Sequence, residues 1–327
     1  MEIPRIDRRR AVQAAFAAAA ALALLVWWLL PANGPSYPKG PVAFSTGVAN
    51  GVYDTYGKLL RTRLDKDLPG VRVELMPSQG SVDNVKRVAT GQADFAIAAA
   101  DAVASYHGPG ASRLRACARL YDDYMQLVVP ADSPIASVKD LRGKRVGIGQ
   151  KDSGVNLITG RLLLAAGLDK AKDLHAETVG INDAPRMLKN GELDAFFWSG
   201  GLPTKAVTDL AQDMDIKLVQ LGDLVDKLPA VSDGQNFYRS AVMPADAYKD
   251  IQGGKAVKTL AVANLLVTTD RADAGLVERI TRTVIDSRDG IGAQVHAAQL
   301  VDLRTAVFTD PLELHEGAVR YYRSVKP

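Results

Sequence analysis

The sequence predicts an α/β protein whose body has two halves, each built from alternating strands and helices. The clearest sign is residues 71–101, where a strand with alternating apolar residues, a helix and a continuous apolar strand follow one another. A second segment of the same kind lies at residues 184–198. The length of 327 residues allows about two domains. Together these observations place one β-α-β unit in each half.

The first 30 residues have the layout of an export signal. Residues 1–10 hold four Arg against one Glu and one Asp, and residues 11–30 are apolar except for Gln13. Residues 1–35 are therefore expected to be a signal or anchor segment with its tether. An uncleaved hydrophobic helix is favoured over a cleaved signal, because the run is long enough to span a bilayer and lacks a good small-x-small cleavage site. Either form exports the body, to the periplasm or the outer face of the cytoplasmic membrane; a buried core helix is the remaining alternative.

The fold is expected to begin with a short strand at residues 42–45, the loop Thr46-Gly-Val-Ala-Asn-Gly51 and a helix. The apolar residues at helical spacing in that helix are Val52, Tyr56, Leu59, Leu60 and Leu64. A glycine-containing loop between a strand and a helix N-terminus is a place where anions bind well. The loop is not a Walker loop, and its glycines do not match the dinucleotide pattern G-x-G-x-x-G. A purely structural glycine turn explains it equally well.

The β-α-β unit at residues 71–101 predicts a second loop of this kind. Alternating apolar residues predict a strand at 71–75, and Ser81 is expected to cap the N-terminus of a helix. Gly91 stands where the C-terminal cap belongs. A short apolar run then ends at Asp101 and is typical of a buried parallel strand. Free backbone N–H groups at the carboxyl ends of these strands suit small anionic groups.

The middle of the chain is expected to build the second half. Two strands are predicted between residues 115 and 130, separated by the polar sequence YDDY. A further strand ends in glycine near Gly149, and a helix begins near Ser153. The leucines of this helix expected to face inward are Leu157, Leu162, Leu163 and Leu164. After the repeat at 184–198, another helix is expected to begin at Gly-Gly-Leu-Pro-Thr, with Pro203 in its first turn.

The last part of the chain is expected to return to the first half. Residues 259–269 predict a long apolar strand, and residues 274–286 predict a helix. We therefore expect lobe 1 to contain residues 36–122 and 268–327, and lobe 2 to contain residues 123–267. Two such lobes facing each other make a cleft that closes on a ligand.

Composition excludes several classes of function. The formal net charge is +3, of which +2 lies in the first ten residues, so the body shows no electrostatic footprint for nucleic acid. Cys117 is the only cysteine and the four His are scattered, so we expect no disulfide, no metal site and no cofactor. The sequence has no Gly-x-Ser-x-Gly nucleophile elbow and no Cys-His pair near a loop. A binding module is therefore expected in preference to an enzyme.

Nine short segments, in order and spread over nearly the whole of residues 41–323, together resemble one family. The segments are Thr46-Gly47, Gly51-Val-Tyr53, Gly80-Ser-Val-Asp-Asn84, Gly91-Gln-Ala-Asp94, Asp140-Leu-Arg-Gly-Lys-Arg-Val146, Ser153-Gly154, Gly191-Glu-Leu-Asp-Ala-Phe-Phe197, Gly200-Gly-Leu-Pro203 and His315-Glu-Gly-Ala-Val-Arg-Tyr-Tyr322. As a set they resemble the TAXI-type solute-binding subunits of tripartite ATP-independent periplasmic (TRAP) transporters.

The resemblance implies a two-lobed periplasmic-binding-protein fold of type II, in which each lobe is a mixed β-sheet flanked by helices. It implies no catalysis. It also implies two partners, a small and often carboxylate-bearing solute of the amino acid or organic acid class and a TRAP-type membrane permease driven by an ion gradient. An ATP-driven importer receptor or an anchored sensor of the same fold remains open.

The chain departs from the family pattern beside the expected cleft. The first loop has fewer glycines at residues 48–50, Gln79 replaces a smaller residue, Ala99-Ala100 replace a polar pair, and Trp198 is bulky. These departures leave the identity of the solute open and do not affect the fold. Taken singly, Tyr53 and Trp198 are explained more readily as core residues than as cleft residues.

Ten residues are expected to bind the solute: Thr46, Gly47, Gly51, Tyr53, Gly80, Ser81, Asp101, Ser153, Gly154 and Gly201. Most lie in loops whose backbone is able to wrap an anion. Asp101 is expected to accept a hydrogen bond from a ligand ammonium, and Arg119 and Arg239 are candidates to pair with a ligand carboxylate. A plain helix cap is the alternative for Ser81, Ser153 and Asp101. We expect the strands near residues 123–130 and 262–269 to bend as the cleft closes.

Overall fold

The computed structural model describes residues 12, 17–22, 39–49, 51–232, 234 and 236–325. By their internal contacts, residues 1–37 and residues 38–327 form two separate units. The expected anchor and tether lie almost wholly outside the described residues. Within the described part of the chain, no helix is long and apolar enough to cross a membrane. Everything below concerns the second unit.

The strands described in this unit form a single mixed sheet. In chain order they are β1 (Gly40–Ser45), β2 (Val71–Met76), β3 (Phe95–Ala99), β4 (Leu114–Pro130), β5 (Arg145–Gly147), β6 (His175–Glu177), β7 (Ala195–Gly200), β8 (Ile216–Val219), β9 (Tyr238–Met243) and β10 (Val257–Thr269). Their order in the sheet is β2-β1-β3-β10-β4-β7-β5-β6, while β8 pairs with β4 and β9 pairs with β10. The pairs β1–β2, β1–β3, β5–β6 and β5–β7 are parallel, and β10 is antiparallel to β3 and β4.

A helix follows each parallel strand, as the sequence pattern predicts, and further helices come after β9 and β10. The helices are α2 (Val52–Asp67), α3 (Ser81–Ala89), α4 (Ala100–Ala104), α5 (Gly154–Ala165), α6 (Ala184–Lys189), α7 (Lys205–Asp213), α8 (Lys249–Gln252), α9 (Ala274–Asp286), α10 (Arg288–Gly292) and α11 (Glu316–Val325). Short 3₁₀ turns lie at residues 111–113, 138–141, 222–231 and 296–300. Because α2, α3 and α5 each begin after the carboxyl end of a parallel strand, their N-termini lie at that edge of the sheet.

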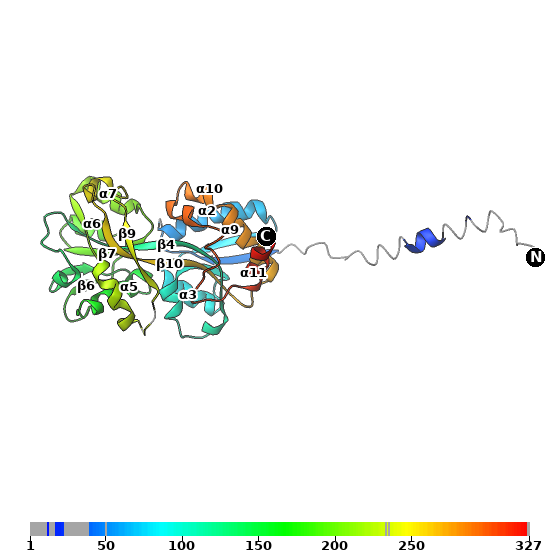
Figure 1. Cartoon of the computed structure of the whole chain (residues 1–327), viewed down its shortest axis with the longest axis horizontal. Coiled ribbons are helices and arrows are strands. Elements are labelled where there is room, and N and C mark those ends of the chain that lie inside the picture. The colour runs from blue at the N-terminus through cyan, green and yellow to red at the C-terminus, as the bar shows by residue number, and fades with distance from the viewer. Residues whose placement is uncertain are drawn as a thin grey trace, which may run out of the picture. The chain divides into compact units, whose positions relative to one another are not determined.

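Two long antiparallel strands, β4 and β10, connect the two groups of helices and strands (Figure 1). The sequence YDDY was expected to separate two strands, and this expectation is wrong, because β4 continues through it. Asp122 lies opposite Ala263 and Asp123 opposite Val262 in the ladder with β10. Backbone hydrogen bonds to β10 thus hold these polar residues in the strand, against their low preference for sheets.

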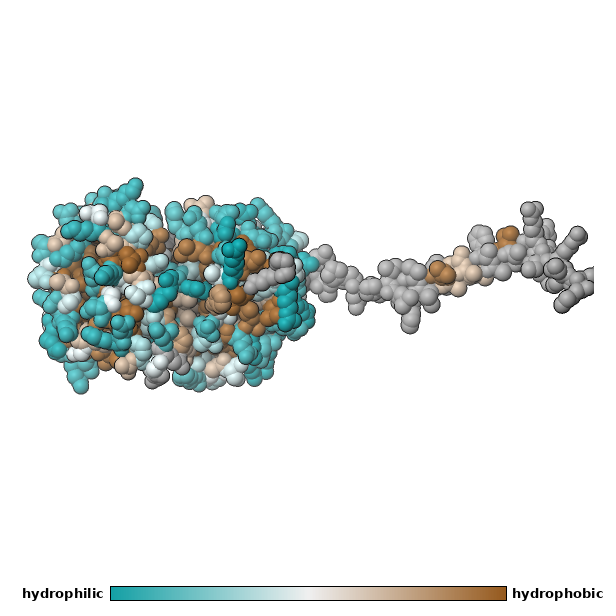
Figure 2. All heavy atoms as spheres, in the orientation of Figure 1, coloured by the Kyte–Doolittle hydropathy of each residue, from teal (hydrophilic) through white to brown (hydrophobic). Residues whose placement is uncertain are grey.

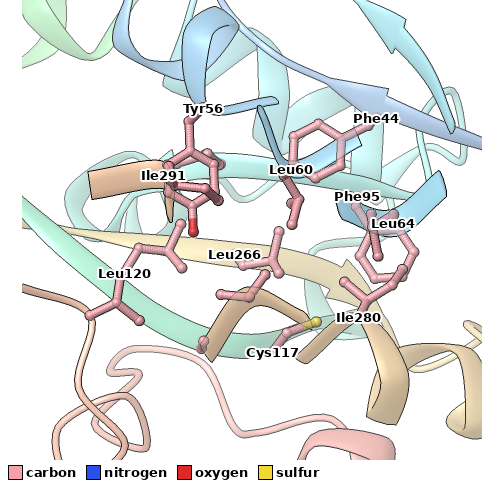
Figure 3. Close-up of a cluster of buried hydrophobic side chains, with 14 of the residues drawn as sticks. Phe44, Tyr56, Leu60, Leu64, Phe95, Cys117, Leu120, Leu266, Ile280 and Ile291 are labelled. Carbon is pink, nitrogen blue, oxygen red and sulfur yellow. The ribbon is translucent and has the colours of Figure 1, made fainter. Parts of the chain in front are cut away.

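The first group of strands has an apolar core against α2 and α9. Figure 3 shows this cluster, in which Phe44, Leu60, Phe95, Leu266 and Ile280 come from five different elements and pack together. Each side chain is almost wholly buried. Burial of a side chain of this size contributes about 1.5–3 kcal/mol relative to exposure.

A second core lies beneath α5 and brings together Val146, Leu162, Leu163, Phe197 and Leu260. The separation of the two cores is in keeping with two lobes; the residue boundaries of the lobes stay a proposal. Hydrophilic residues line much of the outer edge of the body, while apolar residues show at several places on the face in Figure 2.

Two details of the predicted helices are wrong. Leu164 is 56% exposed, whereas Leu162 and Leu163 are buried. Successive helical residues turn by about 100°, so three consecutive leucines cannot all face one core. Pro203 is not in a first helical turn, because α7 begins at Lys205 after the cap residue Thr204. The turn at Gly91 agrees with expectation, since its φ of +75° is the left-handed conformation that ends helices.

Candidate functional site

A cavity of about 70 Å³ lies between the two groups of strands. Its wall is formed by the β1–α2 loop, the β2–α3 loop, the β5–α5 loop and the end of β7. Apolar side chains predominate: Val48, Val52, Val155, Ile158, Phe197 and Trp198. One buried water needs about 10–15 Å³ of cavity volume, so this cavity has room for a few waters or a small organic molecule.

Three helix N-termini meet at this cavity. Val52 and Tyr53 of α2, Ser81 of α3, and Gly154 and Val155 of α5 all line it. The first N–H groups of a helix have no partner within the helix, and the helix dipole makes this end partially positive. The arrangement therefore suits a small anionic group bound by backbone donors.

The N-terminus of α3 begins one residue earlier than expected. Gly80 is the cap residue, with a φ of +122°, and Ser81 is the first helical residue without a capping hydrogen bond of its own. The Ser81 hydroxyl instead accepts a hydrogen bond from Ala99 N at 3.1 Å and lies 3.0 Å from the Tyr53 hydroxyl. A Cβ atom on Gly80 would lie 3.4 Å from Ser153, so glycine here also allows the two sides of the cavity to approach.

At the N-terminus of α5, Ser153 is a helix cap. Its hydroxyl accepts from Asn156 N at 3.1 Å and donates to the Gln150 carbonyl at 2.7 Å. The Ser153 hydroxyl therefore acts as a plain helix cap, which is the alternative that the sequence left open for this residue. Gly154 follows directly, and a Cβ atom there would lie 3.1 Å from the Ser81 hydroxyl. The α3 and α5 N-termini thus face each other at close range.

Tyr53 presents a polar group to the cavity. Its hydroxyl donates to the Asn264 amide oxygen and contacts Ser81. Burial raises the pKa of Tyr53 well above its ordinary value, with a further rise from Asp123, so the phenol stays protonated. Tyr53 is therefore both a cavity residue and part of the packing around α2.

Asp123 is a cavity residue that the sequence reasoning missed. Its side chain is almost fully buried, and burial raises its pKa from 3.8 to about 7. The neighbouring Asn264 side chain lowers the pKa, while Asp122 and Asp101 raise it further. Oδ1 of Asp123 and Nδ2 of Asn264 have no hydrogen-bond partner among the described residues. The polar YDDY sequence inside an otherwise apolar strand was the signal that could have identified it.

The wall of the cavity contains no Lys, Arg or His among the described residues. Arg119 and Arg239, the candidates to pair with a ligand carboxylate, both pair with Asp122 instead. They line a different hollow, together with Tyr124. Any carboxylate bound in the cavity would therefore rely on backbone N–H groups and not on an arginine fork.

Seven of the ten expected binding residues line the cavity: Gly47, Gly51, Tyr53, Gly80, Ser81, Ser153 and Gly154. The structure does not bring the other three there. Thr46 is buried and donates to the Met76 carbonyl, and Gly201 lines a neighbouring hollow beside Ala297.

Asp101 is engaged elsewhere in the fold. It is fully buried, accepts a hydrogen bond from the Tyr238 hydroxyl at 2.8 Å and lies 3.5 Å from Arg161. In place of the expected contact with a ligand ammonium, Asp101 forms an ion pair with Arg161 of α5 and accepts a hydrogen bond from Tyr238 of β9. Asp101 was expected at the cleft as the end of a parallel strand, but β3 ends at Ala99 and Asp101 is the second residue of α4.

The two sides of the cavity touch at its mouth. Gln150 Nε2 lies 3.3 Å from Gln79 Oε1, and Asp83 N donates to the Asp152 carbonyl at 3.1 Å. Asn182 Nδ2 donates to the Ala49 carbonyl at 3.3 Å. These contacts join the β1–α2 and β2–α3 loops to the other group of strands, as in a closed form.

The comparisons with known proteins agree with this architecture. A family model, described as the NMT1-like family, matches residues 44–325. The periplasmic binding protein BugD is similar in structure, with 17% identity, a TM-score of 0.55 and coverage of 88% of this chain and 94% of that one. A binding protein component of an ABC phosphonate transporter from Pseudomonas aeruginosa has 11% identity, a TM-score of 0.52 and 80% coverage of both chains. The fold is the mixed α/β fold of type II periplasmic binding proteins, as predicted.

Proposed function

This chain belongs to the NMT1-like family, and on that premise we propose that it binds a small carboxylate-bearing solute and delivers it to a TRAP-type membrane permease. The family and the fold are those of extracytoplasmic solute-binding proteins of transport systems, and not of enzymes. The solute class is amino acids or other small organic acids. The site is the cavity at the N-termini of α2, α3 and α5.

The proposal that the solute has a carboxylate rests on one observation. Three helix N-termini converge on one small cavity. Each terminus contributes about 0.3–1 kcal/mol to a nearby anion at the surface, and up to about 2 kcal/mol where the site is partly buried. Glycines at 51, 80 and 154 lie at these helix N-termini and line the cavity.

The proposal that the partner is a TRAP-type permease is supported by the resemblance of the ordered sequence segments to TAXI-type subunits. Export is supported by the basic and then apolar N-terminal sequence, which places the receptor in the periplasm or on the outer face of the membrane. Uptake into proteoliposomes that hold the permease should then require the loaded receptor and an ion gradient. Uptake that required ATP instead would identify an importer of the ATP-driven type.

The binding proposal is tested by a thermal-shift screen of the full chain. The screen contains the standard amino acids, dicarboxylates, oxo acids and small aromatic acids. A solute at 100 times its Kd stabilises the folded state by about 2.7 kcal/mol, so a true ligand produces a clear rise in Tm. Uncharged amides of the same acids serve as controls. No shift from any acid, or equal shifts from acid and amide, would contradict the proposal.

A further inference from the structure

Among the described residues, one buried carboxyl group lacks the cationic partner that the others have. The buried carboxylates and their partners are Asp54 with Lys58, Asp101 with Arg161, and Asp122 with Arg119 and Arg239. Asp123 is equally buried and has no such pair. It is also the one of the four that lines the cavity. Leaving a carboxylate both buried and unpaired is costly, so the position calls for a partner from outside the chain.

The groups around Asp123 supply no positive charge. The cavity wall has no Lys, Arg or His among the residues that the structure describes, and the nearby titratable groups are Tyr53, Tyr121, Asp122 and Asp101. Asn264 faces the same carboxyl, yet its Nδ2 also lacks a partner in the described residues. A buried carboxyl without a cationic partner among the described residues thus lies in the wall of the cavity, where a ligand can supply one.

Building on the proposed function, we propose that Asp123 accepts a hydrogen bond from the protonated amine of the solute. The solute is then a zwitterion, an amino acid whose carboxylate lies at the helix N-termini and whose ammonium lies at Asp123. Asp123 takes the role that the sequence had placed on Asp101. It selects amino acids against acids that lack an amine.

The apolar wall indicates the side chain of this amino acid. Val155, Ile158, Phe197 and Trp198 line the cavity, and the Trp198 ring nitrogen is already occupied by Thr204 at 3.1 Å. The ring therefore offers an apolar surface. A volume of about 70 Å³ has room for a few waters, so the cavity suits an amino acid with a small apolar side chain, such as alanine, valine or leucine.

Charge balance separates a zwitterion from a simple acid. A carboxylate without an amine would add a second negative charge beside Asp123, and Asp101 and Asp122 already raise its pKa. A zwitterion adds no net charge and places its cation next to the lone carboxyl. An alternative in which a protonated Asp123 donates to the ligand carboxylate predicts the opposite preference, so the two are separable by experiment.

The test compares matched ligands by calorimetry with the full chain. The sets are alanine, propionate and ethylamine; valine, 3-methylbutanoate and 2-methylpropylamine; and leucine, 4-methylpentanoate and 3-methylbutylamine. At least one amino acid should bind, and removal of its amine should raise Kd by about 30-fold or more, as expected for loss of a buried charged partner. Asp123→Asn should raise Kd for that amino acid by a similar factor and lower Kd for its deaminated acid, because the negative charge beside the ligand carboxylate is removed.

Asp122→Asn is the matched control, because it removes the same charge from the neighbouring residue, which faces Arg119 and Arg239. Its Kd should stay within about twofold of the wild-type value. Asp123→Ala and circular dichroism check that any loss reflects binding and not unfolding.

Every other outcome contradicts either the assignment of Asp123 or the proposed function. If an acid without an amine binds as well as its amino acid, or if Asp123→Asn binds normally, the assignment of Asp123 is wrong while the proposed function stands. If the screen finds only acids that are not amino acids, the assignment of Asp123 is also wrong while the proposed function stands. If no acid binds at all, the proposed function fails and the inference fails with it.

Discussion

Asp123 and Asp101 show how the surroundings of an aspartate decide its role. Asp123 lies in β4 and Asp101 in the first turn of α4, and both have pKa values raised by burial. Tyr238 and Arg161 contact Oδ2 of Asp101 and lower its pKa, while its Oδ1 has no hydrogen bond among the described residues. Asp123 has only the Asn264 amide beside it. Asp101 is thus paired within the protein, and Asp123 is the carboxyl that we propose to meet a ligand.

At the residue scale, the raised pKa of Asp123 predicts a pH-dependent stability. Its pKa is about 7 in the folded protein and 3.8 ordinarily, so the folded state binds the proton more tightly. Protonation of Asp123 therefore stabilises the folded state, and this contribution is fully present below about pH 4. It is lost as pH rises through 7, and the loss reaches about 4 kcal/mol by pH 8. Asp123→Asn should therefore be more stable than the wild type at pH 8 and equal to it near pH 4, measured by urea unfolding without ligand.

Asp122→Asn should behave differently in the same experiment. It leaves Arg119 and Arg239 without their carboxylate and should lower stability at pH 8. A stability difference for Asp123→Asn that is the same at pH 4 and pH 8 would contradict the assignment of a raised pKa to this residue.

At the element scale, the proposed site is built from helices that begin at the same edge of the sheet. α2, α3 and α5 follow β1, β2 and β5, and their first turns line the cavity. The cap residues Gly51 and Ser153 have extended backbones, while Gly80 needs a left-handed φ. In the proposed site these loops contact the ligand through their backbone, and the part of the wall that the structure describes holds no arginine.

Proline at the first position of α2 tests this use of backbone donors. Val52→Pro removes one N–H group at the cavity, and proline is tolerated there because Gly51 is extended, with ψ of 169°. We expect Kd for the solute found in the screen to rise about 5–10-fold, the equivalent of about 1–1.4 kcal/mol for one hydrogen bond to an anion. Fold stability should change little.

Ala274→Pro is the control for this substitution. It stands at the first position of α9, after the extended cap residue Asp273, and is remote from the cavity. It should leave Kd unchanged. Equal effects of the two prolines on binding, or none from either, would remove the α2 N-terminus from the site.

At the scale of the whole folded body, we expect β4 and β10 to bend as the cavity opens and closes. Both strands run between the two cores, and the loops on either side of the cavity touch through Gln79 and Gln150. Closure of this kind buries a ligand and expels water from its polar contacts. Opening would separate the α3 and α5 N-termini, which face each other across Gly80 and Ser153.

Small-angle scattering tests the closure. Addition of the solute found in the screen should reduce the radius of gyration, because ligand shifts the population toward the closed form. The double variant Gln79→Ala/Gln150→Ala loses one contact across the mouth and should bind about twofold to fivefold more weakly, in line with about 0.5–1 kcal/mol for one hydrogen bond. Identical scattering profiles with and without solute would exclude closure as part of the mechanism.

The sequence by itself determined the α/β class, most of the helices and strands, and the loops at the carboxyl ends of the strands. Apolar periodicity and glycine positions are local signals, so β2, α3 and β3 were found from residues 71–101 alone. Seven of the ten expected binding residues reach the cavity for the same reason, because backbone loops lie where their own strand and helix place them.

Only the tertiary structure decided which charged side chains face the cavity. Asp101 was expected there and is paired with Arg161, while Asp123 was passed over within YDDY and lines the wall. Arg119 and Arg239 pair with Asp122. Each of these outcomes depends on a partner from a distant segment and on the register of β4 against β10, and neither leaves a periodic signal in the sequence. Local periodicity thus determines the elements, and long-range pairing determines which carboxyl is left for a ligand.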